Sequence, residues 1–113
     1  MYNVKLTEIA EKDILDAAMY IAHNLSNIAA ANRLLDEFDA AVKSLSDFPM
    51  RHPLVRDDFL ASKGLRSLPV KKYLMFYVVR EETHNVNVIR FIHSRRDWVK
   101  LFNESMFDEI SGV

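Results

Sequence analysis

The sequence predicts an α+β domain in which an antiparallel two-helix hairpin packs on a small curved antiparallel sheet. Residues 2–6 alternate polar and apolar side chains, as a short strand does. Two stretches with helical periodicity follow between residues 8 and 45, and three strand-like stretches follow between residues 65 and 93. The resulting order, β-α-α-β-β-β, is typical of domains whose helices cover one face of an antiparallel sheet.

The first helix is predicted to begin directly after the first strand. Thr7 has a side-chain oxygen that can cap a helix beginning at Glu8. Apolar residues then recur at spacings of four and three, so we expect one buried stripe and a helix end near His23 or Leu25. The stripe consists of Ile14, Ala18, Ile21 and Leu25.

The second helix is expected after a short connection. Ser26 or Asn27 can cap it, and Phe48-Pro49 ends it. Its apolar residues repeat every three or four positions, and the short connection makes the two helices an antiparallel hairpin. The repeating residues are Ile28, Ala31, Leu35, Phe38, Val42 and Leu45.

One long connection leads into the three remaining strands. Residues 49–63 lack either period, so we expect an irregular segment that crosses one edge of the sheet. The strand at residues 65–70 contains Pro69, which cannot donate a ladder hydrogen bond and therefore favours an edge or a strand end. Residues 73–80 and 86–93 flank a polar turn and are predicted to form a hairpin.

Strict alternation along the last strand predicts which of its side chains share a face of the sheet. Val88, Arg90 and Ile92 fall on one face, and Ile89, Phe91 and His93 fall on the other. We therefore expect Arg90 on the open face together with Arg66, and His93 near the edge of the core. Phe76 is expected to be buried.

Composition favours one domain spanning residues 1–113. Half of the 113 residues are apolar, which is enough for a single modest core. The absence of cysteine excludes a disulfide framework, a thiolate nucleophile and a cysteine-based zinc site. The first residues do not resemble a signal peptide and no segment is long enough to cross a bilayer, so we expect a cytoplasmic protein without membrane contact.

The net charge of −1 conceals a strong asymmetry along the chain. Residues 1–50 carry 4 basic and 8 acidic side chains, residues 51–100 carry 11 and 5, and residues 101–113 carry 0 and 3. The basic middle block suits a surface that meets phosphate or an acidic protein segment. An ordinary solvated face is the alternative.

Several short patterns recur in an order that covers the chain up to about Phe102. Leu6-Thr7 precedes a helix rich in Glu, Asp and Ala, and ANRLLDE at residues 31–37 leads to a helix end before Pro49. The sequence LPVK at residues 68–71 is followed by VIRFIH at residues 88–93 and RRDW at residues 95–98. In this order the chain resembles the RelE/ParE superfamily of toxins from bacterial type II toxin-antitoxin systems, including the plasmid stabilization family.

The resemblance implies a small protein that arrests growth when free and is neutralised by an antitoxin encoded beside it. RelE-like toxins cut messenger RNA in the ribosomal decoding site, whereas ParE-like toxins poison DNA gyrase and lack the nuclease residues. The acidic helical hairpin and the Arg-x-x-His-x-Arg-x-Asp pattern of residues 90–97 slightly favour the ParE branch. The alternatives are a RelE-like mRNA interferase, an inactive homologue that acts as a peptide-binding module, and a generic RNA-binding domain.

An mRNA interferase needs a base for the ribose 2′-OH, cations for the phosphate and an acid for the leaving oxygen. If the protein is such a nuclease, the catalytic candidates are Arg66, Arg90, His93 and Arg95. The candidates for contact with a target or an antitoxin are Lys71, Lys72, Tyr73, Tyr77, Arg96 and Trp98. No cofactor and no metal are expected, because the histidines are scattered and lack partners at ligand spacing.

Each of these candidates also has a structural interpretation. His93 can also be a packed histidine at a strand end, and Arg66 and Arg90 can be partners of Glu81, Glu82 or Asp97 in ion pairs. Trp98 can pack into the open end of the core while Asp97 pairs with an arginine.

The expected partners are an antitoxin and either DNA gyrase or the ribosome with its mRNA. The basic block and an apolar groove should attract an acidic amphipathic segment that folds on binding, with an affinity that falls as salt rises. The tail, residues 104–109, carries Met106 and Phe107, with Ile110, at helical spacing and is predicted to form a short helix on the same surface. Both a homo-oligomer and a toxin-antitoxin hetero-oligomer remain open.

Overall fold

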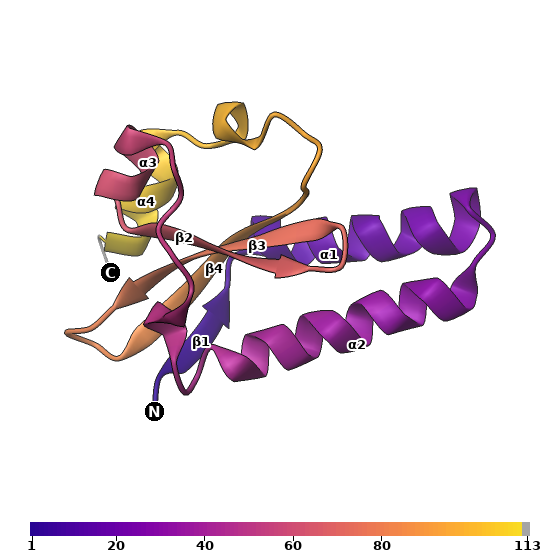
Figure 1. The fold of residues 1–113 in the computed structure, drawn as a ribbon, viewed down its shortest axis with the longest axis horizontal. Helices are drawn as coiled ribbons and strands as arrows, with labels where there is room; N and C mark the ends of the chain where they lie inside the picture. The colour runs from indigo at the N-terminus through magenta and orange to yellow at the C-terminus, as the bar shows by residue number, and fades with distance from the viewer. Residues whose placement is uncertain (112–113) are drawn as a thin grey trace.

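The computed structural model describes residues 1–111, which form a four-stranded sheet with helices on both faces (Figure 1). The predicted α+β order is confirmed, and a short helix, α3, forms where the sequence pattern predicts an irregular segment. The main elements are β1 (Asn3–Leu6), α1 (Glu8–Met19), a π-helical turn (Tyr20–Asn24), α2 (Ile28–Ser44), α3 (Asp58–Ser62), β2 (Leu65–Val70), β3 (Tyr73–Arg80), β4 (Asn85–His93) and α4 (Glu104–Ser111). Short 3-10 turns lie at Pro49–Arg51 and Trp98–Leu101.

The strands lie in the order β1-β4-β3-β2. The pairs β2–β3 and β3–β4 are antiparallel, whereas β1 runs parallel to β4, so the sheet is mixed rather than purely antiparallel. This parallel pair follows from the crossover through the helices between the first strand and the last three. Pro69 lies in β2 at an edge of the sheet, as predicted, and Leu54 of the long connection bridges to Arg66 at this edge.

Caps of the expected kind begin both hairpin helices. Thr7 caps α1, with its Oγ1 accepting from the Ala10 N–H at 3.1 Å, and Asn27 caps α2, with its Oδ1 accepting from the Ala30 N–H at 3.0 Å. Leu25 and Ile28 are nevertheless 57% and 69% exposed, so the predicted stripes do not continue to the end of the hairpin. The π-helical turn explains this for Leu25, because its wider turn shifts the periodicity that a continuous α-helix would keep.

A β-bulge in β4 changes the predicted assignment of its faces. Phe76 pairs with Arg90 and Tyr77 pairs with Val88, so Ile89 is an extra residue in the ladder. Val88 and Phe91 therefore pack together in the cluster under α1 and α2. Ile89 packs with Ile92 in the cluster on the other face of the sheet. The prediction from strict alternation is wrong beyond the bulge, since one inserted residue inverts every later side chain.

The second face of the sheet is covered by α3, α4 and the segment between β4 and α4. Its cluster is built around Phe76, which is buried as predicted, and includes Phe107 of α4. The Trp98 ring lies 4.8 Å from that of Phe76, so Trp98 packs against the core, partly buried, as in its structural interpretation. Asp97 pairs with Lys100 at 3.3 Å rather than with an arginine. The predicted tail helix exists as α4, but it packs on the face of the sheet opposite the helical hairpin and not on the surface expected to receive an antitoxin, so its predicted position is wrong. The side chain of Ile110 lies outside the described residues.

Among the described residues, no helix combines the length and the apolar character that crossing a membrane requires. The helical hairpin extends past the sheet. Figure 1 shows its connected end on the same side as the turn between β2 and β3.

Candidate functional site

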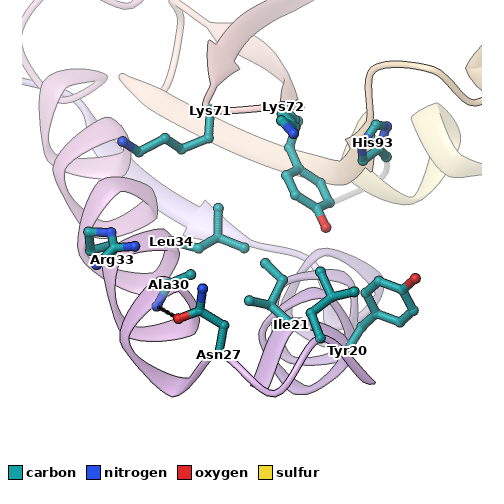
Figure 2. Close-up of a pocket in the computed structure, with 11 residues that line it drawn as sticks. Tyr20, Ile21, Asn27, Ala30, Arg33, Leu34, Lys71, Lys72 and His93 are labelled. Atoms are coloured by element: carbon teal, nitrogen blue, oxygen red, sulfur yellow. Dashed lines mark hydrogen bonds between the residues drawn. The ribbon is translucent and has the colours of Figure 1, made fainter. Parts of the chain in front are cut away.

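A groove of about 460 Å³ lies between the connected end of the hairpin and the turn that joins β2 to β3 (Figure 2). The hairpin supplies most of its wall, and the turn and the end of β4 supply the rest. The lining residues are Tyr20, Ile21, Leu25, Asn27, Ala30, Arg33, Leu34, Lys71, Lys72, Tyr73 and His93. Four predicted site residues therefore meet here: Lys71, Lys72, Tyr73 and His93.

The hairpin side of the groove is apolar and uncharged along residues 17–32, and Arg33 of α2 follows this run at the side nearer the lysines. Residues 17–32 contain no Asp, Glu, Lys or Arg, in a chain in which 27% of residues are charged. Within this run, Tyr20 and Leu25 line the groove and are both more than half exposed. An exposed apolar surface of this kind is typical of an interaction site. The charge-free run is a signal in the sequence that could have revealed this wall.

The opposite side of the groove is basic. Lys71 and Lys72 are the whole of the connection between Val70 of β2 and Tyr73 of β3. Figure 2 shows the side chains of Lys71 and Arg33 on the same side of the groove, across from Tyr20. Within residues 1–111, no ion pair involves either lysine or Arg33. These three cations are therefore available to a partner.

Tyr73 and His93 form a partly buried aromatic end of the groove. The Tyr73 ring stacks on Phe91 at 4.9 Å and meets His93 edge-on at 5.2 Å. Burial raises the pKa of Tyr73 above its ordinary value. The Nδ1 atom of His93 accepts a hydrogen bond from the Arg95 N–H at 3.2 Å, which leaves the other ring nitrogen for a ligand.

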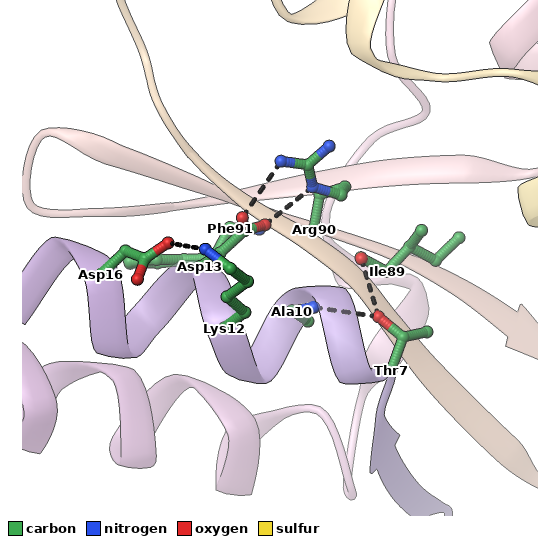
Figure 3. A network of polar contacts seen from close by, with 8 residues as sticks. All are labelled: Thr7, Ala10, Lys12, Asp13, Asp16, Ile89, Arg90 and Phe91. Atoms are coloured by element: carbon green, nitrogen blue, oxygen red, sulfur yellow. Dashed lines mark hydrogen bonds and ion pairs between the residues drawn. The ribbon is translucent and has the colours of Figure 1, made fainter.

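Arg90 is not on an open face. Its Nε and one terminal nitrogen donate to the two carboxylate oxygens of Asp13 on α1, at 2.8 and 3.0 Å (Figure 3). Both side chains are about 15% exposed. The Phe91 N–H donates to the same carboxylate at 2.9 Å. Arg90 therefore joins α1 to the bulge of β4, and its partner is none of the carboxylates that the sequence suggested.

Arg66 holds the long connection against the edge of the sheet. Its guanidinium donates to the His52 carbonyl at 2.6 Å and to the Met50 carbonyl at 3.4 Å. Next to it, the Tyr77 hydroxyl donates to the Pro49 carbonyl at 2.6 Å, and Tyr77 is fully buried. In this conformation Tyr77 cannot contact a target, because its ring belongs to the core.

Arg95 and Arg96 lie in the exposed turn after β4, outside the groove lining. In the described part of the chain, no group of three or more His, Cys, Asp or Glu side chains is arranged to hold a metal ion. The structure thus divides the predicted site residues into three groups: the groove group, the exposed pair, and a structural group in which Tyr77 is buried and Arg66, Arg90 and Trp98 are partly buried.

Known structures share this fold. The chain aligns with a protein from the chromosomal ParDE toxin-antitoxin system of P. aeruginosa with a TM-score of 0.67 and 15% identity, covering 82% of this chain and 96% of that one. It also aligns with a protein from the RelBE2 toxin-antitoxin complex of Mycobacterium tuberculosis, with a TM-score of 0.51 and 22% identity, covering 81% and 96%. No curated protein sequence matches the chain.

Sequence comparison assigns the family more directly than these structural likenesses do. Residues 4–98 match the model of the ParE toxin of the type II toxin-antitoxin system parDE. The matched region contains the whole sheet except Asn3, both hairpin helices and every residue that lines the groove. The chain therefore belongs to the ParE toxin family, within the RelE/ParE superfamily of type II toxins.

Proposed function

We propose that this chain, as one domain of residues 1–113, acts in the cytoplasm as a ParE-like toxin that inhibits DNA gyrase and is neutralised by a cognate antitoxin. Membership of the ParE family supports the toxin role. Both similar structures come from toxin-antitoxin systems, which supports an antitoxin as the partner.

The choice of target rests on one observation, namely what the guanidinium groups of Arg66 and Arg90 bind within the fold. Ribose-directed RNA cleavage needs cationic forks aimed at one phosphate. The Arg90 fork is bound to Asp13, and the Arg66 fork is bound to backbone carbonyls. Two of the four predicted catalytic residues are thus used by the fold, which favours gyrase over mRNA as the target.

The test is a supercoiling and DNA-cleavage assay with purified DNA gyrase, in which the toxin is released from a co-expressed complex with the product of the adjacent gene. We expect loss of supercoiling and accumulation of cleaved DNA, both reversed by that gene product. Unchanged supercoiling at a concentration of toxin that arrests growth would contradict the proposal.

A second candidate, the ribosome-dependent mRNA endonuclease, is favoured by one specific observation. His93, Tyr73 and two lysines line the same groove, and such groups can supply an acid or base, a stacking surface and phosphate contacts. Mapping messenger RNA ends in arrested cells tests it, and a nuclease of this kind would lose its cuts in His93→Gln. If expression causes no arrest at all, the chain is an inactive binding module.

A further inference from the structure

Two exposed turns lie side by side at one end of the sheet. One connects β2 to β3, and the other follows β4. The pairing of β3 with β4 begins at Tyr73 opposite His93, and just beyond this pair the Ser94 N–H donates to the Lys72 carbonyl at 2.9 Å. The backbone therefore joins the two turns, and together they present four exposed cations, which we call the cationic end: Lys71, Lys72, Arg95 and Arg96.

His93 fixes the second of these turns. Its carbonyl accepts from the Arg96 N–H at 3.1 Å, and its Nδ1 atom accepts from the Arg95 N–H at 3.2 Å. The backbone of both arginines is thus held against the end of β4, while their side chains stay exposed. Guanidinium groups on a fixed backbone suit contact with the oxygens of a phosphate or a carboxylate.

The cationic end is remote from the acidic residues of the sheet. Within the described residues, none of its four side chains forms an ion pair, and the neighbouring Asp97 pairs with Lys100. Between residues 59 and 96 the only acidic residues are Glu81 and Glu82, in the turn at the other end of β3. Since β3 has 8 residues, these two carboxylates lie roughly 25 Å away, about three Debye lengths at physiological salt.

The surroundings of the cationic end favour a phosphate backbone over other anionic partners. An amphipathic acidic peptide needs an apolar wall beside its cations, and Arg95 and Arg96 lie outside the groove that offers one. A single-stranded nucleic acid needs aromatic side chains on which its bases stack, and neither turn contains an aromatic residue. A duplex presents its phosphates on the outside, so exposed cations without acidic neighbours are sufficient to bind it.

We propose that the cationic end binds the phosphate backbone of duplex DNA without reading its sequence, and that in the inhibited complex it lies on the DNA that gyrase holds. Only the second part rests on the proposed function, because DNA binding by the free toxin needs no gyrase. With one phosphate for each cation, the logarithm of the binding constant should fall against the logarithm of salt concentration with a slope of about −3.5.

The double variant Arg95→Gln/Arg96→Gln removes half of this charge and keeps the backbone contacts of His93. We expect its affinity for duplex DNA to fall roughly tenfold or more at low salt, and the salt slope to shrink by about 2. The matched control is Lys5→Gln/Lys43→Gln, which removes the same charge from two exposed lysines toward the other end of the sheet. The control should bind DNA within about twofold of wild type.

The experiment is fluorescence anisotropy of a short labelled DNA duplex titrated with purified toxin at increasing salt. Single-stranded DNA and RNA of the same sequence serve as competitors, and thermal denaturation checks that each variant is folded. Lys72→Gln, in the other turn, is a second variant and should lower the slope by about 1. Preference for the duplex, weakened in the arginine variant and kept in the control, supports the proposal.

Three results would overturn the proposal. They are no binding of the duplex by wild-type toxin at low salt, equal affinity of the arginine variant and the control, and a preference for single-stranded RNA. The last of these would instead favour the endonuclease candidate.

Gyrase assays separate the DNA contact from the proposed function. If the arginine variant binds DNA weakly and also inhibits supercoiling less than the control does, both stand. If wild-type toxin binds the duplex through the arginines but leaves supercoiling unchanged, the DNA contact stands and the gyrase function fails. If the arginine variant binds DNA and poisons gyrase as well as wild type does, the function stands and the DNA contact fails.

Discussion

Two basic parts of the sheet differ in burial and in partners. One is Arg90 of β4, which contacts Asp13, and the other is the turn of Lys71 and Lys72 between β2 and β3. Arg90 is partly buried, bound by two hydrogen bonds and placed where the fold needs a partner. The lysine turn is exposed, without an ion pair among the described residues, and strained at Lys71. Basic residues in one stretch of sequence therefore divide into those that hold the fold and those that face a partner.

Arg90 has a structural role because β1 ends before β4 does. Pairing between β1 and β4 stops at Leu6 and Val88, so the next backbone groups of β4 need other partners. Thr7 donates its hydroxyl to the Ile89 carbonyl at 2.9 Å, and Asp13 accepts the Phe91 N–H (Figure 3). Arg90 balances the charge that this carboxylate brings into a partly buried place.

Among the variants that test this comparison, Asp13→Ala should cause the largest loss of stability. The change leaves the Arg90 guanidinium and the Phe91 N–H without their acceptor, so we expect a loss of about 3 kcal/mol in the free energy of unfolding. Urea denaturation measures it. Asp16→Ala is the control, because Asp16 forms an exposed pair with Lys12 and should cost less than about 0.5 kcal/mol. Equal losses in the two variants would contradict the structural role of Asp13.

Tyr77→Phe should have an intermediate effect. The Pro49 carbonyl loses its donor, which should cost about 1–2 kcal/mol near neutral pH. Burial raises the pKa of Tyr77 to about 12, from an ordinary value of 10.0. Between these values the folded state keeps a proton that the unfolded state has lost, so wild-type stability falls as pH rises.

The difference in stability between wild type and Tyr77→Phe should therefore narrow from pH 10 to pH 12. Denaturation midpoints of both proteins across this interval measure the trend. A difference that stays constant would mean that the Tyr77 hydroxyl titrates normally and that its contact with Pro49 opens easily.

Lys72→Ala should have the smallest effect on the fold. Lys72 is exposed and has no ion pair within the described residues, so the free energy of unfolding should change by less than about 0.5 kcal/mol. Thermal denaturation of the free toxin measures it. A loss comparable to that of Tyr77→Phe would remove the contrast between the lysine turn and the structural contacts.

Much of the fold was predictable because it depends on local chemistry. Thr7 and Asn27 cap helices as their side chains allow, and Pro69 lies at a sheet edge because it lacks an N–H. The first helical segment ends at Asn24, close to the predicted end, but the apolar spacing could not predict the π-helical turn that shifts Leu25 outward.

The candidate site was predicted only in part. Lys71, Lys72, Tyr73 and His93 do line one groove, but its other wall comes from the hairpin, where Tyr20, Leu25 and Leu34 were assigned no role or a core role. Helix periodicity could not show that two helices end beside a turn far along the chain, because that proximity is a long-range contact.

The sequence by itself determined the class of fold, the family and the concentration of positive charge in the middle of the chain, since these depend on residue order, spacing and composition. Only the tertiary structure decided which positive charges are available. The bulge at Ile89 turned the later residues of β4, and the end of β1 required Asp13 and Arg90 at that point. A residue's partner depends on what the folded chain brings within hydrogen-bond distance, and no local pattern encodes that distance.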